Sequence, residues 1–138
     1  MIDGGLRPLF RKHVPGFWTS IESGSTGAGI PDAHVIFPNS VCCWVEFKLI
    51  KANAVTLRPH QTAWILRYCR SGGRAFIIVR QKETLYIFDG CTAAELARAG
   101  LKGAAPLLVT TGGPSRWDWV TATTILSGAA QTSGNSPT

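Results

Sequence analysis

Three side chains in the first half of the chain have the types and spacing of a site for a divalent cation. Asp32 stands alone, whereas Glu46 and Lys48 flank Phe47. Because side chains on a strand alternate between its two faces, Glu46 and Lys48 share one face and Val45 and Phe47 share the other. The apolar face belongs in a core. The strand therefore presents a carboxylate and an ammonium side by side.

A predicted hairpin brings Asp32 to the same place. We expect strands at 33–37 and 41–47, joined by a turn at Pro38-Asn39-Ser40. On that register Asp32 lies directly opposite Glu46. Opposed Cβ atoms are about 5 Å apart, and two like charges there destabilise the sheet unless something offsets them. A pairing shifted by one residue would put the two acids on opposite faces.

A divalent cation is the natural offset for this pair of carboxylates. Mg²⁺ and Mn²⁺ prefer oxygen ligands and are often held by one or two carboxylates plus a substrate phosphate. Such a cation lowers the pKa of a bound water, and Lys48 could orient the attacking hydroxide or neutralise the transition state. The alternative is a surface Glu–Lys pair with Asp32 as a turn residue. The hairpin register and the preceding Gly29-Ile30-Pro31 favour the site.

The remaining hydrophobic pattern predicts the elements that position these residues. We expect helices at 6–13, 59–70, 92–99 and 117–126, and further strands at 17–21, 75–79, 84–88 and 107–109. Small residues at 23–29 predict a loop, and residues 128–138 predict a disordered tail. The 138-residue chain therefore forms one domain, over residues 1–127, of the α/β or α+β class.

The distribution of charge indicates a polyanionic partner. The net charge is +6, and every charged residue from Phe47 to Lys82 is basic. Such a block suits the phosphates of a nucleic acid, and it leaves the isolated acids free for a metal. The residues that we expect to contact DNA are Lys51, Arg58, Arg67, Arg70 and Arg74.

Cysteine spacing and hydropathy argue against a zinc-binding, disulfide-rich, membrane or secreted protein. The four cysteines form no CxxC pair, which argues against a zinc site or a disulfide framework. No apolar stretch has the length of a membrane span, and the N-terminal residues lack the apolar run of a signal peptide. We therefore expect a cytoplasmic protein without a membrane partner.

Three segments of the chain, GIPDAHVIF, WVEFK and LRPHQTAWI, resemble the PD-(D/E)xK nucleases. The resemblance is to the VRR-NUC and archaeal-type Holliday junction resolvase branch, and it covers residues 21–79. It rests on a glycine loop, Gly-Ile-Pro-Asp, Glu-Phe-Lys and a helix glutamine, in this order. It implies a restriction-endonuclease-like fold with a central mixed β-sheet flanked by helices. It also implies Mg²⁺ or Mn²⁺ dependence and cleavage of DNA by a homodimer, as in the many phage-encoded small members.

The resemblance also assigns roles by position. Asp32 and Glu46 would be metal ligands, the backbone carbonyl of Phe47 a third ligand, and Lys48 the catalytic lysine. Gln61 matches the helix glutamine, and its helical spacing places it on the sheet-facing side, where a buried amide needs a partner. It would support the site, and a structural hydrogen bond to the backbone is the alternative.

Glu22 is the remaining candidate. Many relatives place an acidic residue in the first helix, where this sequence offers only Asp3. Glu22, just before the glycine loop, would take that role in the site. A surface carboxylate at the loop edge is the alternative.

Together these features predict a divalent-metal-dependent endonuclease that hydrolyses phosphodiester bonds in branched DNA, such as Holliday junctions formed in DNA recombination. It would act in the cytosol of a bacterium or a phage-infected host. Two alternatives stay open. One is a nicking or restriction-like nuclease on duplex DNA, and the other is a non-catalytic DNA-binding module that retains the fold.

Overall fold

One sheet with helices on both faces makes up the domain. The computed structural model describes residues 3–21 and 29–129. Within them the elements are α1 (Leu6–His13), β1 (Phe17–Ser20), β2 (Ala33–Ile36), β3 (Cys42–Ile50), α2 (Pro59–Arg70), β4 (Ala75–Gln81), β5 (Thr84–Asp89), α3 (Ala93–Ala99), β6 (Leu108–Thr110) and α4 (Trp119–Ser127). Short 3₁₀ turns at Gly90–Thr92 and Gly100–Gly103 flank α3.

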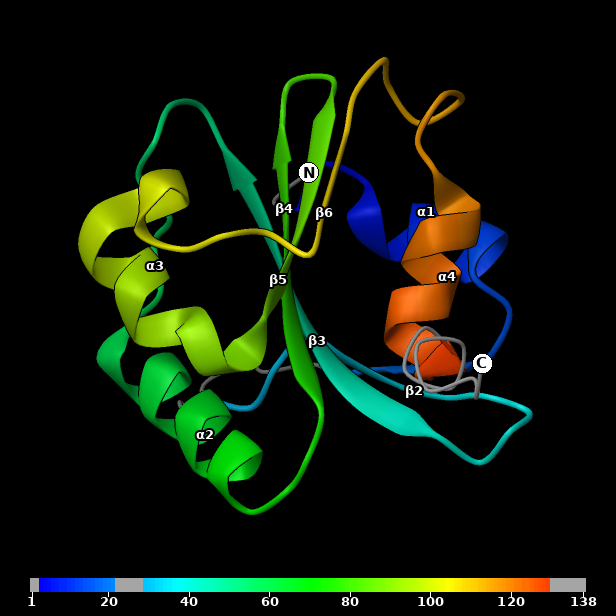
Figure 1. The fold of residues 1–138 in the computed structure, drawn as a ribbon, viewed down its shortest axis with the longest axis horizontal. Coiled ribbons are helices and arrows are strands. Elements are labelled where there is room, and N and C mark those ends of the chain that lie inside the picture. The colour runs from blue at the N-terminus through cyan, green and yellow to red at the C-terminus, as the bar shows by residue number, and fades with distance from the viewer. Residues whose placement is uncertain (1–2, 22–28, 130–138) are drawn as a thin grey trace, which may run out of the picture.

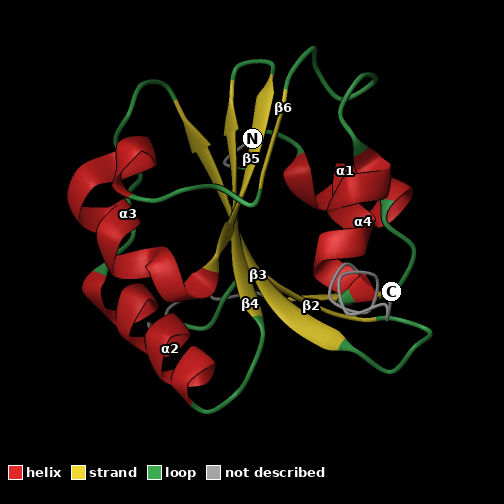
Figure 2. Cartoon of the chain, in the orientation of Figure 1, coloured by secondary structure: helices red, strands yellow, loops and turns green. Residues whose placement is uncertain are grey.

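The six described strands lie in sequence order, β1-β2-β3-β4-β5-β6. Only β3 and β4 pair in parallel, because α2 carries the chain back between them, and the other neighbours are antiparallel. Helices α2 and α3 cover one face of the sheet, while α1 and α4 cover the other (Figure 1). Figure 2 shows the strands as a layer between the two helical layers. The prediction of a mixed α/β domain with a central sheet is confirmed.

Alternation along the central strands divides the core in two. On β3, Val45 and Phe47 pack with Phe10 of α1 and Leu126 of α4. The opposite face of the sheet packs against α2 and α3, and Ile77 of β4 belongs to that second core. Side chains on these strands therefore alternate between the two cores, with the period of two that strand geometry requires.

The predicted register of the β2–β3 hairpin is confirmed. Ala33 pairs with Val45 and Ile36 with Cys42. At the turn, Phe37 donates from its backbone nitrogen to the carbonyl oxygen of Val41 at 2.9 Å. The β2 ladder ends at Ala33, so the next residue in the same register, Asp32, comes beside β3 at Glu46.

Several boundaries differ from the predicted ones for physical reasons. β3 runs on to Ile50 because its parallel partner β4 continues to pair with it as far as Gln81. α4 begins at Trp119 because the Asp118 carboxylate caps it, accepting a hydrogen bond from the backbone nitrogen of Thr121 at 3.0 Å.

Some predictions fall on residues that the structure does not describe. Glu22, the loop at 23–28 and the tail from 130 onward lie outside the described residues. Among the residues that it does describe, no helix has the length and apolar character needed to cross a bilayer.

Candidate active site

Glu46 is buried at the centre of the predicted site. Its side chain points from β3 toward α2, and the residue is only 2% exposed. Lys48, on the same face of the strand, places its Nζ 3.2 Å from Oε2 of Glu46. Gln61, in the first turn of α2, donates from Nε2 to the same oxygen at 3.0 Å. The other oxygen, Oε1, is buried and has no hydrogen-bond partner among the described residues.

Asp32 reaches β3 from the end of β2. Its backbone carbonyl accepts a hydrogen bond from Ile21 at 2.8 Å, which ties it to the end of β1. Its Oδ2 accepts from the backbone nitrogen of Phe47 at 2.8 Å, where the β2 ladder no longer provides a partner. Its Oδ1 accepts from Nη2 of Arg7 on α1 at 3.1 Å. The structure therefore brings Asp32 and Glu46 together.

The Gly29-Ile30-Pro31 segment before Asp32 has a specific backbone requirement. Gly29 has φ +79°, and a Cβ atom on it would lie 2.3 Å from the carbonyl oxygen of His60 at the start of α2. Only glycine fits both the left-handed conformation and this close approach. The segment thus packs against α2 and delivers Asp32 to the same helix end that carries Gln61.

The surroundings of Glu46 favour its protonated form. Burial, and next the negative charge of Asp32, raise the pKa of Glu46 to about 7 from an ordinary value of 4.5, while Lys48 acts in the lowering direction. A carboxylate that is buried beside a second carboxylate needs a compensating positive charge. Lys48 provides part of it.

The donor set fits a hard divalent cation. Asp32 and Glu46 supply carboxylate oxygens, and Oε1 of Glu46 is buried with no hydrogen-bond partner in the described part of the chain. The backbone nitrogen of Phe47 points to Asp32. Because the N–H and C=O of one strand residue point to the same side, the carbonyl of Phe47 lies on the side of β3 from which Asp32 approaches. Within residues 3–21 and 29–129, no cluster of three His, Cys, Asp or Glu side chains forms. Two carboxylates and a carbonyl suffice for Mg²⁺ or Mn²⁺ that also takes a substrate phosphate.

These groups line a cleft with a volume of about 880 Å³. Two of the basic residues expected to contact DNA, Lys51 and Arg58, lie on its wall and are exposed. The charged and amide side chains that line it are Asp3, Arg7, Asp32, Glu46, Lys48, Lys51, Arg58 and Gln61. The cleft therefore combines the carboxylate pair with an excess of exposed positive charge.

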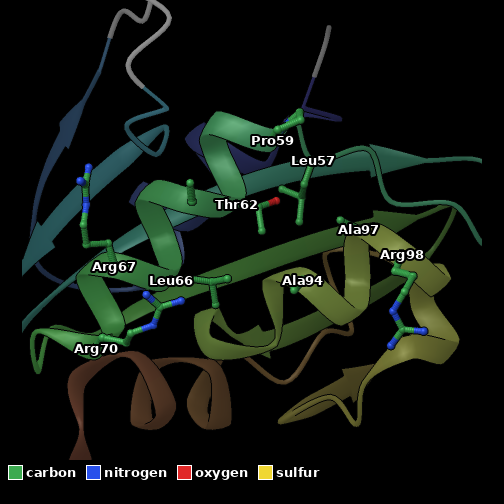
Figure 3. Close-up of a pocket in the computed structure, with 10 residues that line it drawn as sticks. Leu57, Pro59, Thr62, Leu66, Arg67, Arg70, Ala94, Ala97 and Arg98 are labelled. Atoms are coloured by element: carbon green, nitrogen blue, oxygen red, sulfur yellow. The ribbon is translucent and has the colours of Figure 1, made fainter.

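The other expected DNA contacts lie elsewhere. Arg67 and Arg70 line a separate groove of about 750 Å³ between α2 and α3, together with Arg98 (Figure 3). Arg74 does not reach either surface. Its guanidinium donates to the carbonyl oxygens of Leu126 and Ile125 at 2.7 and 2.8 Å, so it caps the end of α4.

Arg7 is a member of the site that the sequence did not predict. It lies on α1, far from the motif in the chain, and its basic side chain has no spacing relation to Asp32. Asp3, considered at the sequence level as a first-helix acid, lines the same cleft and lies 3.8 Å from Nε of Arg7. Glu22 falls outside the described residues, so its role stays a prediction.

No protein-family model matches this sequence, and no curated protein matches it either. Fold and site together define a mixed α/β domain in which a buried glutamate–lysine pair and a second carboxylate share one cleft.

Proposed function

We propose that this protein is an endonuclease of the PD-(D/E)xK type, with a restriction-endonuclease-like fold, that depends on Mg²⁺ or Mn²⁺. The observation that carries the proposal is the arrangement at Glu46. Its buried carboxylate has one oxygen without a hydrogen-bond partner among the residues that the structure describes, has Lys48 at 3.2 Å, and lies beside Asp32 in the predicted register. This arrangement lowers the stability of the fold, since the pKa of Glu46 is raised to about 7, and such destabilising carboxylates are typical of functional sites.

The residues that would hold the cation are Asp32, Glu46 and the carbonyl of Phe47. When bound, Mg²⁺ or Mn²⁺ would supply a Lewis acid that lowers the pKa of water and stabilises charge on phosphate. Lys48 places a positive charge beside Glu46, where a phosphodiester gains negative charge during hydrolysis. Gln61 holds Glu46 and Lys48 in position, with its Oε1 3.5 Å from Nζ of Lys48.

The substrate that we propose is DNA, with branched DNA such as a Holliday junction preferred. The positive charge of the cleft at Lys51 and Arg58 supports a phosphate backbone running past Glu46. Arg67 and Arg70 on the neighbouring groove would contact a more distant part of the same substrate. A homodimer would cut both strands of a symmetric junction. We propose that the protein acts in DNA recombination, in the cytosol of a bacterium or a phage-infected host.

The deciding experiment is a cleavage assay with Asp32→Asn and Glu46→Gln on four-way junctions, forks, flaps and linear duplex, with Mg²⁺, Mn²⁺ or EDTA. We expect the unaltered protein to cleave DNA and EDTA to abolish this cleavage. The cleavage rate should be at least about a hundredfold lower in each variant. Glu95→Gln is the matched control, because Glu95 is an exposed carboxylate on α3 outside the cleft. Cleavage at the unaltered rate in either site variant contradicts the proposal.

The same panel separates the open alternatives. Cleavage of linear duplex at a rate equal to that of junctions indicates a nicking or restriction-like enzyme. DNA binding without cleavage under every metal condition indicates a non-catalytic module that retains the fold.

A further inference from the structure

Both oxygens of Asp32 are in use. Oδ2 accepts from the backbone of Phe47, and Oδ1 accepts from Nη2 of Arg7 at 3.1 Å. Oε2 of Glu46 is likewise engaged by Lys48 and Gln61. Of the four carboxylate oxygens in the pair, only Oε1 of Glu46 lacks a partner among the described residues. A cation that uses both acids must therefore take an oxygen that already has a donor.

The Arg7 contact is the one that can be released. The nitrogen of Phe47 is fixed in β3, whereas Arg7 is a long side chain that crosses from α1 and is 33% exposed. Its Nε is buried and has no hydrogen-bond partner in residues 3–21 and 29–129, and Oδ2 of Asp3 lies 3.8 Å from it. Within the described part of the chain, the guanidinium thus makes one side-chain hydrogen bond, to Asp32, out of the five that it could donate.

Charge also opposes simultaneous binding. Arg7 lies in the same cleft as Glu46, and a divalent cation near Oδ1 of Asp32 would repel a guanidinium that stayed at 3.1 Å from the same oxygen. The released guanidinium would remain on the wall of the cleft. There, a phosphate oxygen of the substrate is an acceptor that matches its planar geometry.

We propose that Arg7 is a resident counter-ion of the free protein: it occupies Asp32 until a divalent cation binds, and it then becomes a ligand for a substrate phosphate. This inference rests on the proposed metal-dependent function. It makes metal binding and DNA binding mutually reinforcing, because Asp32 neutralises the positive charge of Arg7 until the cation displaces it, and that charge is then available to phosphate.

The first test is calorimetric titration with Mn²⁺ in the absence of DNA. Arg7→Gln keeps much of the side-chain length but removes the charge, and we expect it to bind Mn²⁺ about three- to tenfold more tightly than the unaltered protein. Arg7→Lys keeps the charge and should stay close to the unaltered affinity. Arg11→Gln is the control on the same helix, because among the described residues Arg11 contacts Ser20 and neither Asp32 nor Glu46.

The second test measures binding of a short DNA duplex with EDTA or with Ca²⁺, which takes the same oxygen ligands. The gain in DNA affinity on adding Ca²⁺ should be larger for the unaltered protein than for Arg7→Gln. Thermal unfolding of each variant shows whether the fold is retained.

The outcomes separate the two proposals. No Mn²⁺ binding by the unaltered protein overturns the metal-dependent function itself. If the unaltered protein binds Mn²⁺ and Arg7→Gln binds it equally or more weakly, only the counter-ion role is overturned. The counter-ion role is also overturned if Arg7→Lys binds Mn²⁺ as tightly as Arg7→Gln does. In that case Arg7 is a structural tie for Asp32.

Discussion

Gln61 donates a hydrogen bond from Nε2 to Oε2 of Glu46 at 3.0 Å, and this contact joins the first turn of α2 to β3. Its Oε1 accepts from the backbone nitrogen of Arg58 at 3.0 Å and so also closes the N-terminus of the helix. One amide side chain therefore satisfies a helix end and holds the buried carboxylate. The position of α2 and the geometry of the site depend on each other.

Replacing Gln61 by Ala should affect stability and activity together. The change leaves the nitrogen of Arg58 without its acceptor and removes one donor from buried Glu46, so we expect a loss of about 1 to 2 kcal/mol in the free energy of unfolding. Cleavage should fall about ten- to a hundredfold, because Glu46 loses its fixed position. Urea unfolding and initial cleavage rates measure the two effects. Unaltered cleavage would mean that Gln61 serves only as a helix cap.

Replacing Lys48 by Met should remove cleavage and leave DNA binding. The aliphatic side chain fills similar space, but the positive charge 3.2 Å from Glu46 is lost. We expect a decrease of at least about a hundredfold in the cleavage rate with little change in DNA affinity. Lys51→Met is the control, because Lys51 is exposed on the same cleft wall. A similar decrease in the control would mean that general positive charge, rather than Lys48 itself, accelerates the reaction.

Stability of the metal-free protein should fall as pH rises through the titration of Glu46. Burial and the charge of Asp32 raise the pKa of Glu46 to about 7 from 4.5. Between these values the folded chain retains a proton that the unfolded chain has released. The stabilisation from this proton is therefore complete below about pH 4.5 and is lost as pH rises to about 7. The free energy of unfolding should decrease by roughly 2 to 3 kcal/mol across this range.

Urea unfolding in EDTA at pH 5 and pH 8 measures this change, and the same titration in Glu46→Gln is the control that should lack it. A metal-free protein whose stability rises across this window through Glu46 would contradict the direction of the pKa shift. Because a metal ligand must be deprotonated, Mn²⁺ affinity should also rise with pH through about 7.

Replacing Arg67 and Arg70 should weaken DNA binding, whereas replacing Arg74 should lower stability. Arg67 and Arg70 are exposed on the groove between α2 and α3, so replacing both by Ala should weaken DNA binding and lower the salt slope by about 2. Arg74→Ala should leave that slope unchanged and cost about 2 kcal/mol of stability, because it removes two hydrogen bonds to α4. Fluorescence anisotropy at several salt concentrations tests this contrast. An unchanged slope in the double variant would place DNA away from this groove.

Gly29→Ala should disturb the site through the backbone. The added Cβ would lie 2.3 Å from the carbonyl oxygen of His60, and the alanine would have to adopt φ +79°. We expect a loss of about 1 to 3 kcal/mol and weaker Mn²⁺ binding, since Asp32 follows directly. Gly72→Ala is the matched control, with φ +93° and open space around the Cβ. It should cost about 1 kcal/mol and leave Mn²⁺ binding unchanged, and an equal effect on Mn²⁺ binding in both variants would contradict a local role of Gly29.

The amino-acid sequence alone determined the strand alternation and the hairpin register around the site. Both depend on local rules: side chains on a strand alternate, and a three-residue turn sets which residues oppose one another. These rules correctly placed Lys48 beside Glu46, and the hairpin pairing of Ala33 with Val45 that leads to Asp32. The start of α2 at Pro59 followed in the same way from a helix-start signal.

Only the tertiary structure decided which distant residues meet that motif. Arg7 reaches Asp32 from α1, and Arg74 is directed to the end of α4, because the order of strands and the two helical layers bring these elements together. Glu46 is almost fully buried because α2 covers its face of the sheet, which no spacing within β3 specifies. Periodicity reports which face a residue occupies, but the neighbour on that face depends on contacts between elements far apart in the chain.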